Sequence, residues 1–261
     1  MSTKDLRVKV ITPKSANTIV KKYHYSGTVC KTSQIHFGIF KNNILVGALQ
    51  FGGSIDKRRM GMSLGIGMNE SLELNRMAIS DVCGKNTESR VIGICLRILK
   101  KKYPFLRCIV SFSDACQCGD GIIYRASNFK LHSYKENKSL LNLSEQALSE
   151  YRKYDPLANN PVAIKSLDNK CIKNKAPHGY KKKIYGLGVT PISGYQMKYI
   201  YYFDKELEKI HPSVPFDKIP DKVRMYKGIK RIEHESNATS NQNVESGAIP
   251  TNTLHKKSGV I

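Results

Sequence analysis

Two apolar segments joined by a short polar turn restrict the fold of this chain more than any other feature of its sequence. Residues Ile35–Phe40 alternate as in a β-strand, and Ile44–Phe51 forms a second strand-like run after Asn42-Asn43. The pattern predicts an antiparallel hairpin with a two-residue turn. The glycine- and methionine-rich stretch that follows, residues 52–68, offers little to pack and is expected to be a mobile loop.

A strand–helix–strand pattern comes after the hairpin. Strands are predicted at Leu72–Ile79 and at Cys108–Ser113, and apolar residues at helical spacing predict a helix over Ser89–Lys102 between them. A shorter helix is expected over residues 13–23, ahead of the hairpin. This order predicts an α+β, mixed α/β architecture with helices flanking a central mixed sheet, and it disfavours a doubly wound parallel sheet.

The composition divides the chain into four parts. Residues 165–183 carry seven lysines and one acidic residue, Asp168, and they lie in a region that breaks the rhythm of the sheet. The last residues are rich in Ser, Asn, Thr and Gly, which is typical of disorder. The predicted parts are a core at 1–134, a basic insertion at 135–190, a C-terminal strand and helix that complete the core at 191–233, and a disordered tail at 234–261.

The charge of the chain indicates its partner. Lys and Arg number 43 against 21 Asp and Glu, which gives a net charge of +22. A field of this sign attracts polyanions, so nucleic acid is the expected partner and an anionic membrane surface the alternative. No apolar run reaches the ~20 residues of a membrane span, and the N-terminus lacks the apolar core of a secretory signal. The odd count of seven Cys fits reduced thiols, so we expect a soluble, cytoplasmic protein without a membrane partner.

A run of three lysines, Lys181, Lys182 and Lys183, is the densest charge in the insertion. Phosphate contacts need charge but no sequence-specific geometry, so this run is expected to contact the DNA backbone. The alternative is a solvated surface arm that only aids solubility.

The start of the predicted helix at Ser89 suggests a phosphate site. Arg90, Gly93 and Cys95 loosely match Arg-x-x-Gly-x-Gly/Ala, the pyrophosphate turn of acetyl-CoA-dependent acyltransferases, with Cys95 where Gly or Ala is usual. Free amides and the positive end of a helix dipole hold phosphates at such a turn. The other interpretation is an ordinary helix start.

Five polar residues are candidates for chemistry. Asp114 ends a buried strand, where sites of α/β proteins lie, and Tyr124 follows ten residues later. His24 and Tyr25 form a polar break after the first helix, and such side chains serve as base and acid near neutral pH. Arg76 lies in the middle of a strand and needs a partner, such as an anionic cofactor. A helix cap, a core tyrosine and a surface histidine are the structural alternatives.

These pieces, in this order, resemble the Mom family of DNA-modification proteins of Mu-like phages. The long block SFSDACQCGDGIIYRASNF, residues 111–129, is the most specific part of the resemblance. The other matching stretches are YHYSG at 23–27, the hairpin FGIF with ILVGALQFG, ELNRM at 73–77, ESR at 88–90 with LR at 96–97, and more faintly MKYIYYF at 197–203.

The resemblance implies an acetyltransferase-like (GNAT-related) fold and an enzyme that adds an acetamido (methylcarbamoyl) group to adenine N6 in duplex DNA. That product would protect phage DNA from restriction in the host bacterial cytoplasm. By residue matching, His24, Tyr25, Asp114 and Tyr124 would form the catalytic site. Arg76 would hold the cofactor or order the site, and Ser89, Arg90 and Gly93 would bind acetyl-CoA. Whether His24 and Asp114 hold a metal ion stays open.

Two other hypotheses remain beside this one. A protein or small-amine N-acyltransferase would keep the cofactor turn but would not need the basic insertion. A non-catalytic DNA-binding anti-restriction protein would explain the charge but would leave the four candidate catalytic residues without a role.

Overall fold

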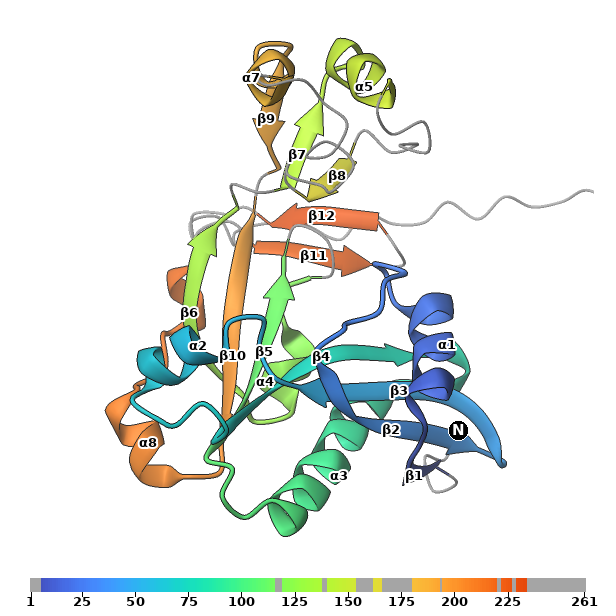
Figure 1. The fold of residues 1–261 in the computed structure, drawn as a ribbon, viewed down its shortest axis with the longest axis vertical. Coiled ribbons are helices and arrows are strands. Elements are labelled where there is room, and N and C mark those ends of the chain that lie inside the picture. Colours follow the sequence, from blue (N-terminus) through green and yellow to red (C-terminus); the bar gives the residue numbers. More distant parts are fainter. Residues whose placement is uncertain are drawn as a thin grey trace, which may run out of the picture.

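The computed structural model describes residues 6–115, 119–137, 140–153, 162–165, 180–192, 194–219, 222–226 and 229–233. A seven-stranded mixed sheet with the strand order β1-β2-β3-β4-β5-β10-β6 forms its centre (Figure 1). Within this sheet β4 and β5 pair in parallel, and the other neighbouring strands pair antiparallel. The strands are β1 (Leu6–Val10), β2 (Ser33–Lys41), β3 (Ile44–Gly52), β4 (Ser71–Ile79), β5 (Cys108–Asp114), β6 (Lys130–Glu136) and β10 (Tyr195–Tyr202).

Helices cover both faces of the sheet, as its alternating side chains require. Helices α3 (Thr87–Lys102) and α4 (Ile122–Ala126) lie on one face, which we call the α3/α4 face, where α3 and the sheet build the largest core cluster. The opposite face, the α1/α2 face, carries α1 (Pro13–Tyr23), α2 (Lys57–Leu64) and α8 (Lys205–Ile210). Here α1 packs on Ala48 and Ala78, whereas Leu64 of α2 and Leu207 of α8 pack on Val110.

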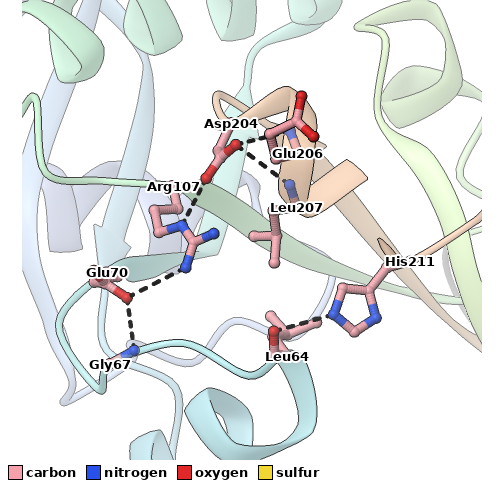
Figure 2. A network of polar contacts seen from close by, with 8 residues as sticks. All are labelled: Leu64, Gly67, Glu70, Arg107, Asp204, Glu206, Leu207 and His211. Atoms are coloured by element: carbon pink, nitrogen blue, oxygen red, sulfur yellow. Dashed lines mark hydrogen bonds and ion pairs between the residues drawn. The ribbon is translucent and has the colours of Figure 1, made fainter. Parts of the chain in front are cut away.

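Helices α2 and α8, which cover the start of β5, are held in place by a polar network (Figure 2). Arg107 Nε donates to Asp204 Oδ2 at 2.7 Å, and Asp204 in turn caps α8 by accepting from the amides of Glu206 and Leu207. His211 Nε2, just after α8, donates to the carbonyl oxygen of Leu64 at 3.0 Å and so ties α8 to α2. The two helices are therefore fixed relative to the first residues of β5.

The parallel pair opens beyond its first residues. Strands β4 and β5 are in register only from Ser71↔Cys108 to Glu73↔Val110. Beyond this point β4 continues along β3, with a register shift that leaves Asn75 as an extra residue, and β5 continues along β10 as far as Asp114. The second halves of β4 and β5 are thus unpaired with each other, and we call this divergence of the two strands the opening in the sheet.

The described residues between 140 and 191 leave the main sheet and contain a small sheet of their own, drawn at the top of Figure 1. This excursion starts after β6 and ends before β10, and these two strands pair with each other in the main sheet. Its elements are β7 (Leu140–Leu143), α5 (Glu145–Arg152), β8 (Val162–Lys165), α7 (Tyr180–Tyr185) and β9 (Val189–Pro191), with the strand order β8-β7-β9.

The remaining elements are short. They are two 3₁₀ turns, η2 (Asp81–Cys83) and η3 (Phe216–Lys218), and a hairpin of β11 (Lys222–Tyr226) and β12 (Ile229–Glu233). The predicted tail at 234–261 lies outside the described residues. No helix in the described part of the chain is long and apolar enough to cross a membrane.

Two expectations from the sequence need correction. The stretch 52–68 is not a mobile loop throughout, because it contains α2, whose start is capped by the Asp56 side chain accepting from Arg59 N. Gly65 ends this helix in the left-handed conformation, with φ 64°. In addition, an N-terminal strand, β1, precedes α1 and extends the sheet beyond the hairpin.

Candidate active site

The loop between α1 and β2 presents the first two candidate residues. His24 follows the last residue of α1 and leaves the helical conformation, with its amide still donating to the Val20 carbonyl oxygen. The rings of His24 and Tyr25 lie 4.4 Å apart between their centroids, and Tyr25 is 58% exposed. The two rings therefore pack against each other at the surface of the loop.

The hydrogen bonds of His24 define its tautomer. The amide of Ser26 donates to His24 Nδ1 at 3.2 Å, and Ser26 Oγ lies 2.8 Å from the same nitrogen. Since a backbone N–H can only donate, Nδ1 accepts, and the neutral ring carries its proton on Nε2. Burial, and secondly the positive charge of Arg76, lowers the pKa of His24 to about 4. At neutral pH the ring is uncharged and presents an Nε2–H donor.

Arg76 fastens this loop to β4 beside the opening in the sheet. Its Nε donates to the Thr28 carbonyl oxygen at 2.9 Å, and its Nη1 donates to the Asn75 carbonyl oxygen at 2.6 Å. Asn75 accepts from Ser33 Oγ through Oδ1, while its buried Nδ2 has no hydrogen-bond partner among the described residues. Arg76 thus links the loop to β4, its role at the site stays a prediction, and the Nδ2 of Asn75 is an unused donor among the described residues.

Asp114 lies on the same face as Arg76. The pairing of β5 with β10 is unbroken from Cys108 to Asp114, so the side chains of β5 alternate strictly. Cys108 and Val110 pack under α2 and α8, which places Asp114 on the α1/α2 face as well. Ser111 points to the other face, where its buried Oγ has no partner within the described ranges. The second half of β5 therefore offers polar groups to both faces beside the opening.

Tyr124 belongs to the opposite face. Its ring packs 5.5 Å from that of Tyr199 and 5.7 Å from that of Phe129, between centroids, in the core cluster under α3. Tyr199 Oη donates to the Asp120 carbonyl oxygen at 2.7 Å, and Gly121 has no room for a Cβ, which would lie 2.4 Å from the Tyr199 ring. The start of α4, and with it Tyr124, is thus held against β10.

The four predicted catalytic residues are therefore divided between the two faces. His24, Tyr25 and Asp114 belong to the α1/α2 face, and Tyr124 belongs to the α3/α4 face. Between the two groups lie the second halves of β4 and β5, which no longer pair with each other. Their action at one reacting centre remains a prediction.

The start of α3 has no side-chain cap, as the start of a helix that binds an anion would. Asn86 caps the helix with its backbone in the left-handed conformation but with no side-chain hydrogen bond, and Ser89 Oγ donates to its carbonyl oxygen at 3.3 Å. A Cβ added at Gly93 would meet only Arg97 Nη1, at 3.9 Å. A side chain would therefore fit at this position, so packing does not require a glycine here. Inside a helix, Gly lowers stability by about 1 kcal/mol relative to Ala. Uncapped amides, Arg90 and an open glycine fit a phosphate-bearing cofactor.

The remaining candidate contacts lie in the excursion. Lys183 of α7 donates from Nζ to Glu150 Oε1 at 2.7 Å, so part of its charge is already compensated. The side chains of Lys181 and Lys182 are outside the described part of the structure. No group of three or more His, Cys, Asp or Glu side chains within the described ranges is placed to hold a metal ion.

A comparison with protein-family models decides the ancestry of the chain. The model of the Mom protein family matches residues 5–220. The protein belongs to this family. A curated relative in the family comparison is "Methylcarbamoylase mom" of Escherichia phage Mu, which is 36% identical over 129 residues. That match covers 49% of this chain and about half, 53%, of the relative.

The solved structures with some similarity to this Mom family member include acetyltransferases. A GNAT family acetyltransferase from Elizabethkingia anophelis with acetyl-CoA bound has a TM-score of 0.37 and 12% identity, covering 77% of this chain and 99% of that one. The ribosomal-protein-S18-alanine N-acetyltransferase of Escherichia coli has a TM-score of 0.41 and 6% identity, covering 76% of this chain and 94% of that one.

Proposed function

We propose that this Mom family member modifies adenine bases of duplex DNA at N6, adding an acetamido group whose two carbons come from an acyl-CoA. Membership of the Mom family over residues 5–220 carries the proposal. The arrangement of the candidate residues around the opening between β4 and β5 supports it, because donor and acceptor can approach from opposite faces.

The donor is assigned to the α3/α4 face. The first turn of α3 and Arg90 would hold the pyrophosphate, and Gly93 would let the cofactor lie close to the helix. When bound, the cofactor would supply a two-carbon acyl unit as a thioester. Transfer of that unit alone would leave an acetyl group on N6, so the acetamido product needs a nitrogen donor and a two-electron oxidant besides the acyl-CoA. Tyr124 lies on this face and would donate the proton that the departing thiolate needs.

The adenine is assigned to the α1/α2 face. Asp114 would accept a proton from the N6 amino group, whose lone pair is delocalised into the ring and makes it a weak nucleophile. His24 would donate a hydrogen bond from Nε2, since its Nδ1 is already occupied by Ser26. Arg76 acts as a positioning residue through Thr28.

The base must leave the helical stack to reach this site, as in other enzymes that act on a base inside a duplex. The net charge of +22 supports capture of the duplex, and the basic run Lys181–Lys183 is proposed to contact its phosphates. A modified N6 would then obstruct enzymes that read adenine in the major groove, which is the basis of the proposed protection from restriction.

The test is mass spectrometry of nucleosides from plasmid DNA that was co-expressed with the protein. The acetamido product contains one NH group more than a simple acetyl product, so the mass identifies which group was transferred. Unmodified adenine, with the protein folded and expressed, would reject the proposal. Acetylated amines or proteins in the same cells would then favour the small-amine or protein acyltransferase.

A further inference from the structure

Phe112 is a half-exposed aromatic residue in the middle of the sheet. It is 47% exposed, whereas Cys108 and Val110, which point to the same face of β5, are fully buried. Leu64 of α2 and Leu207 of α8 cover Val110 and Cys108, so the helical cover on this face stops before Phe112. A large apolar side chain left bare beside buried neighbours is more informative than a lone exposed leucine on a surface.

The surroundings of Phe112 connect it with the candidate site. It lies beyond Val110, the last residue of β5 that pairs with β4, so its strand is paired only with β10 at this level. Asp114 follows two residues later on the same face, at a spacing of about 7 Å along a strand. Directly across on β10 is Lys198, so Phe112 has a basic residue as its cross-strand neighbour and the candidate base two residues along its own strand.

We propose that Phe112 is the platform on which the extruded adenine stacks while its N6 group faces Asp114. The inference rests on the proposed function and adds the surface that holds the base. A flat ring offers a purine a stacking contact worth about 1–3 kcal/mol, and it does so without fixing the sequence around the base. The net charge of +22 favours a polyanion, and hence a nucleic acid, as the occupant.

Phe105 provides a matched control. It is 57% exposed, in the connection between α3 and β5, and its ring contacts that of Tyr103 at 6.0 Å between centroids. It therefore precedes β5, at the end of the strand opposite to Asp114. A change from Phe to Leu removes the same aromatic ring at both positions, but only Phe112 shares a face with Asp114.

The experiment uses the full chain and two duplexes of one sequence. One duplex has a central unpaired adenine, which removes the cost of opening a base pair, and the other has an abasic residue at that position. The wild type is expected to bind the adenine duplex more tightly. Phe112→Leu should reduce this preference by about 5- to 150-fold, as the loss of one stacked base requires. Phe112→Tyr, which keeps a ring, and Phe105→Leu should retain it.

Three results would overturn the platform. They are a wild type without preference for adenine, a Phe112→Leu variant that keeps the preference, and an equal loss in Phe105→Leu. Nucleoside analysis separates this failure from failure of the proposed function. If Phe112→Leu modifies plasmid DNA with an unchanged KM, the function stands and the platform is wrong. If the wild type leaves adenine unmodified but keeps a Phe112-dependent preference, the platform stands and the proposed chemistry is wrong.

Discussion

Arg76 Nε donates a hydrogen bond of 2.9 Å to the carbonyl oxygen of Thr28 and so fastens the loop of His24 and Tyr25 to β4. The guanidinium makes a second bond within β4, to the Asn75 carbonyl oxygen at 2.6 Å. The loop and the strand are therefore coupled through one side chain. Because hydrogen bonds to charged groups are about twice as strong as neutral ones, this coupling is stronger than an ordinary loop contact.

Replacing Arg76 with Gln should release the loop. We expect a loss of about 1–2 kcal/mol in unfolding free energy and a larger fall in modification rate, because the loop loses its anchor. The pKa of His24 should rise above about 4, since the Arg76 charge lowers it, but stay below 6.5, since burial is the larger cause. An NMR titration of the imidazole measures this shift.

Arg59→Gln is the control for that experiment. Its side chain is 88% exposed on α2, and its ion pair with Asp56 is long, at 3.9 Å. The control should change neither the His24 titration nor the exchange rates of the loop amides. An unchanged His24 pKa in Arg76→Gln would show that Arg76 does not act on the loop as described.

His24 should make the protein less stable in acid. Its pKa is about 4 when folded and near 6.5 when unfolded, so both states are neutral above 6.5 and the residue has no effect there. As the pH falls from 6.5 to 4, the unfolded chain takes up a proton that the folded chain does not, and stability is lost. His24→Gln should therefore lose less stability than the wild type between pH 7 and pH 4.5.

Urea unfolding at the two pH values measures this difference. Burial also lowers the pKa values of His36 and His132, so the wild type and the variant share a common acid destabilisation. Only the difference between the two proteins belongs to His24. Equal losses in both would mean that His24 titrates normally in the folded protein.

Asp114→Asn should abolish modification and leave the fold intact. The change removes the proton acceptor proposed for N6 but keeps the volume of the side chain. We expect a fall in rate of at least about 100-fold, typical of a lost general base, with a melting temperature close to that of the wild type. Nucleoside mass spectrometry and thermal unfolding measure the two quantities.

Asp56→Asn serves as the matched change, because Asn still caps α2. It should leave both activity and stability nearly unchanged. If Asp114→Asn is active, Asp114 is not the general base. If Asp114→Asn is inactive and also less stable, Asp114 is a structural residue at the end of β5.

The order of the main elements could be predicted from the sequence because each has a strong local signal. The hairpin predicted at Ile35–Phe40 and Ile44–Phe51 is β2 and β3, and the helix predicted from Ser89 is α3, which starts two residues earlier. The signals of α2 were present too, in the Asp56 cap and the Gly65 stop, but its glycines and methionines hid its periodicity. β1 was missed although LRVKV alternates.

The site could be predicted only in part, because sequence shows residue types but not faces. The resemblance to the Mom family singled out Asp114 and Tyr124, yet their faces follow only from the pairing of β5 with β10 and from the packing of Tyr124 against Tyr199. The alternation of β5 assigns Phe112 to the same face as Val110, but only the structure shows that the helices covering Val110 do not reach Phe112. Long-range pairing and cover are tertiary properties that local patterns do not contain.

The basic run of α7 allows a prediction that separates paired from unpaired charge. Lys183 Nζ lies 2.7 Å from Glu150 Oε1, and hydrogen bonds from Lys153 and Lys183 lower the pKa of Glu150, so this carboxylate is charged at neutral pH. A phosphate must compete with Glu150 for Lys183. Neutralising Lys183 should therefore change DNA binding less than neutralising a lysine that makes a full phosphate contact.

The double variant Lys181→Gln/Lys182→Gln should weaken binding to all DNA sequences alike. Each lost phosphate contact flattens the slope of log affinity against log salt by up to ~0.9, so the double variant should show a change approaching twice that of a single contact.

Lys183→Gln should change the slope by less than one contact, and Glu150→Gln should steepen it, because Lys183 is then released. Donor binding should stay the same in all three, since α7 belongs to the small sheet and α3 to the main one. Titrations of one duplex at several salt concentrations give the slopes. If the double variant keeps the slope of the wild type, the run makes no contact with DNA, and the phosphates must bind another basic face of the protein.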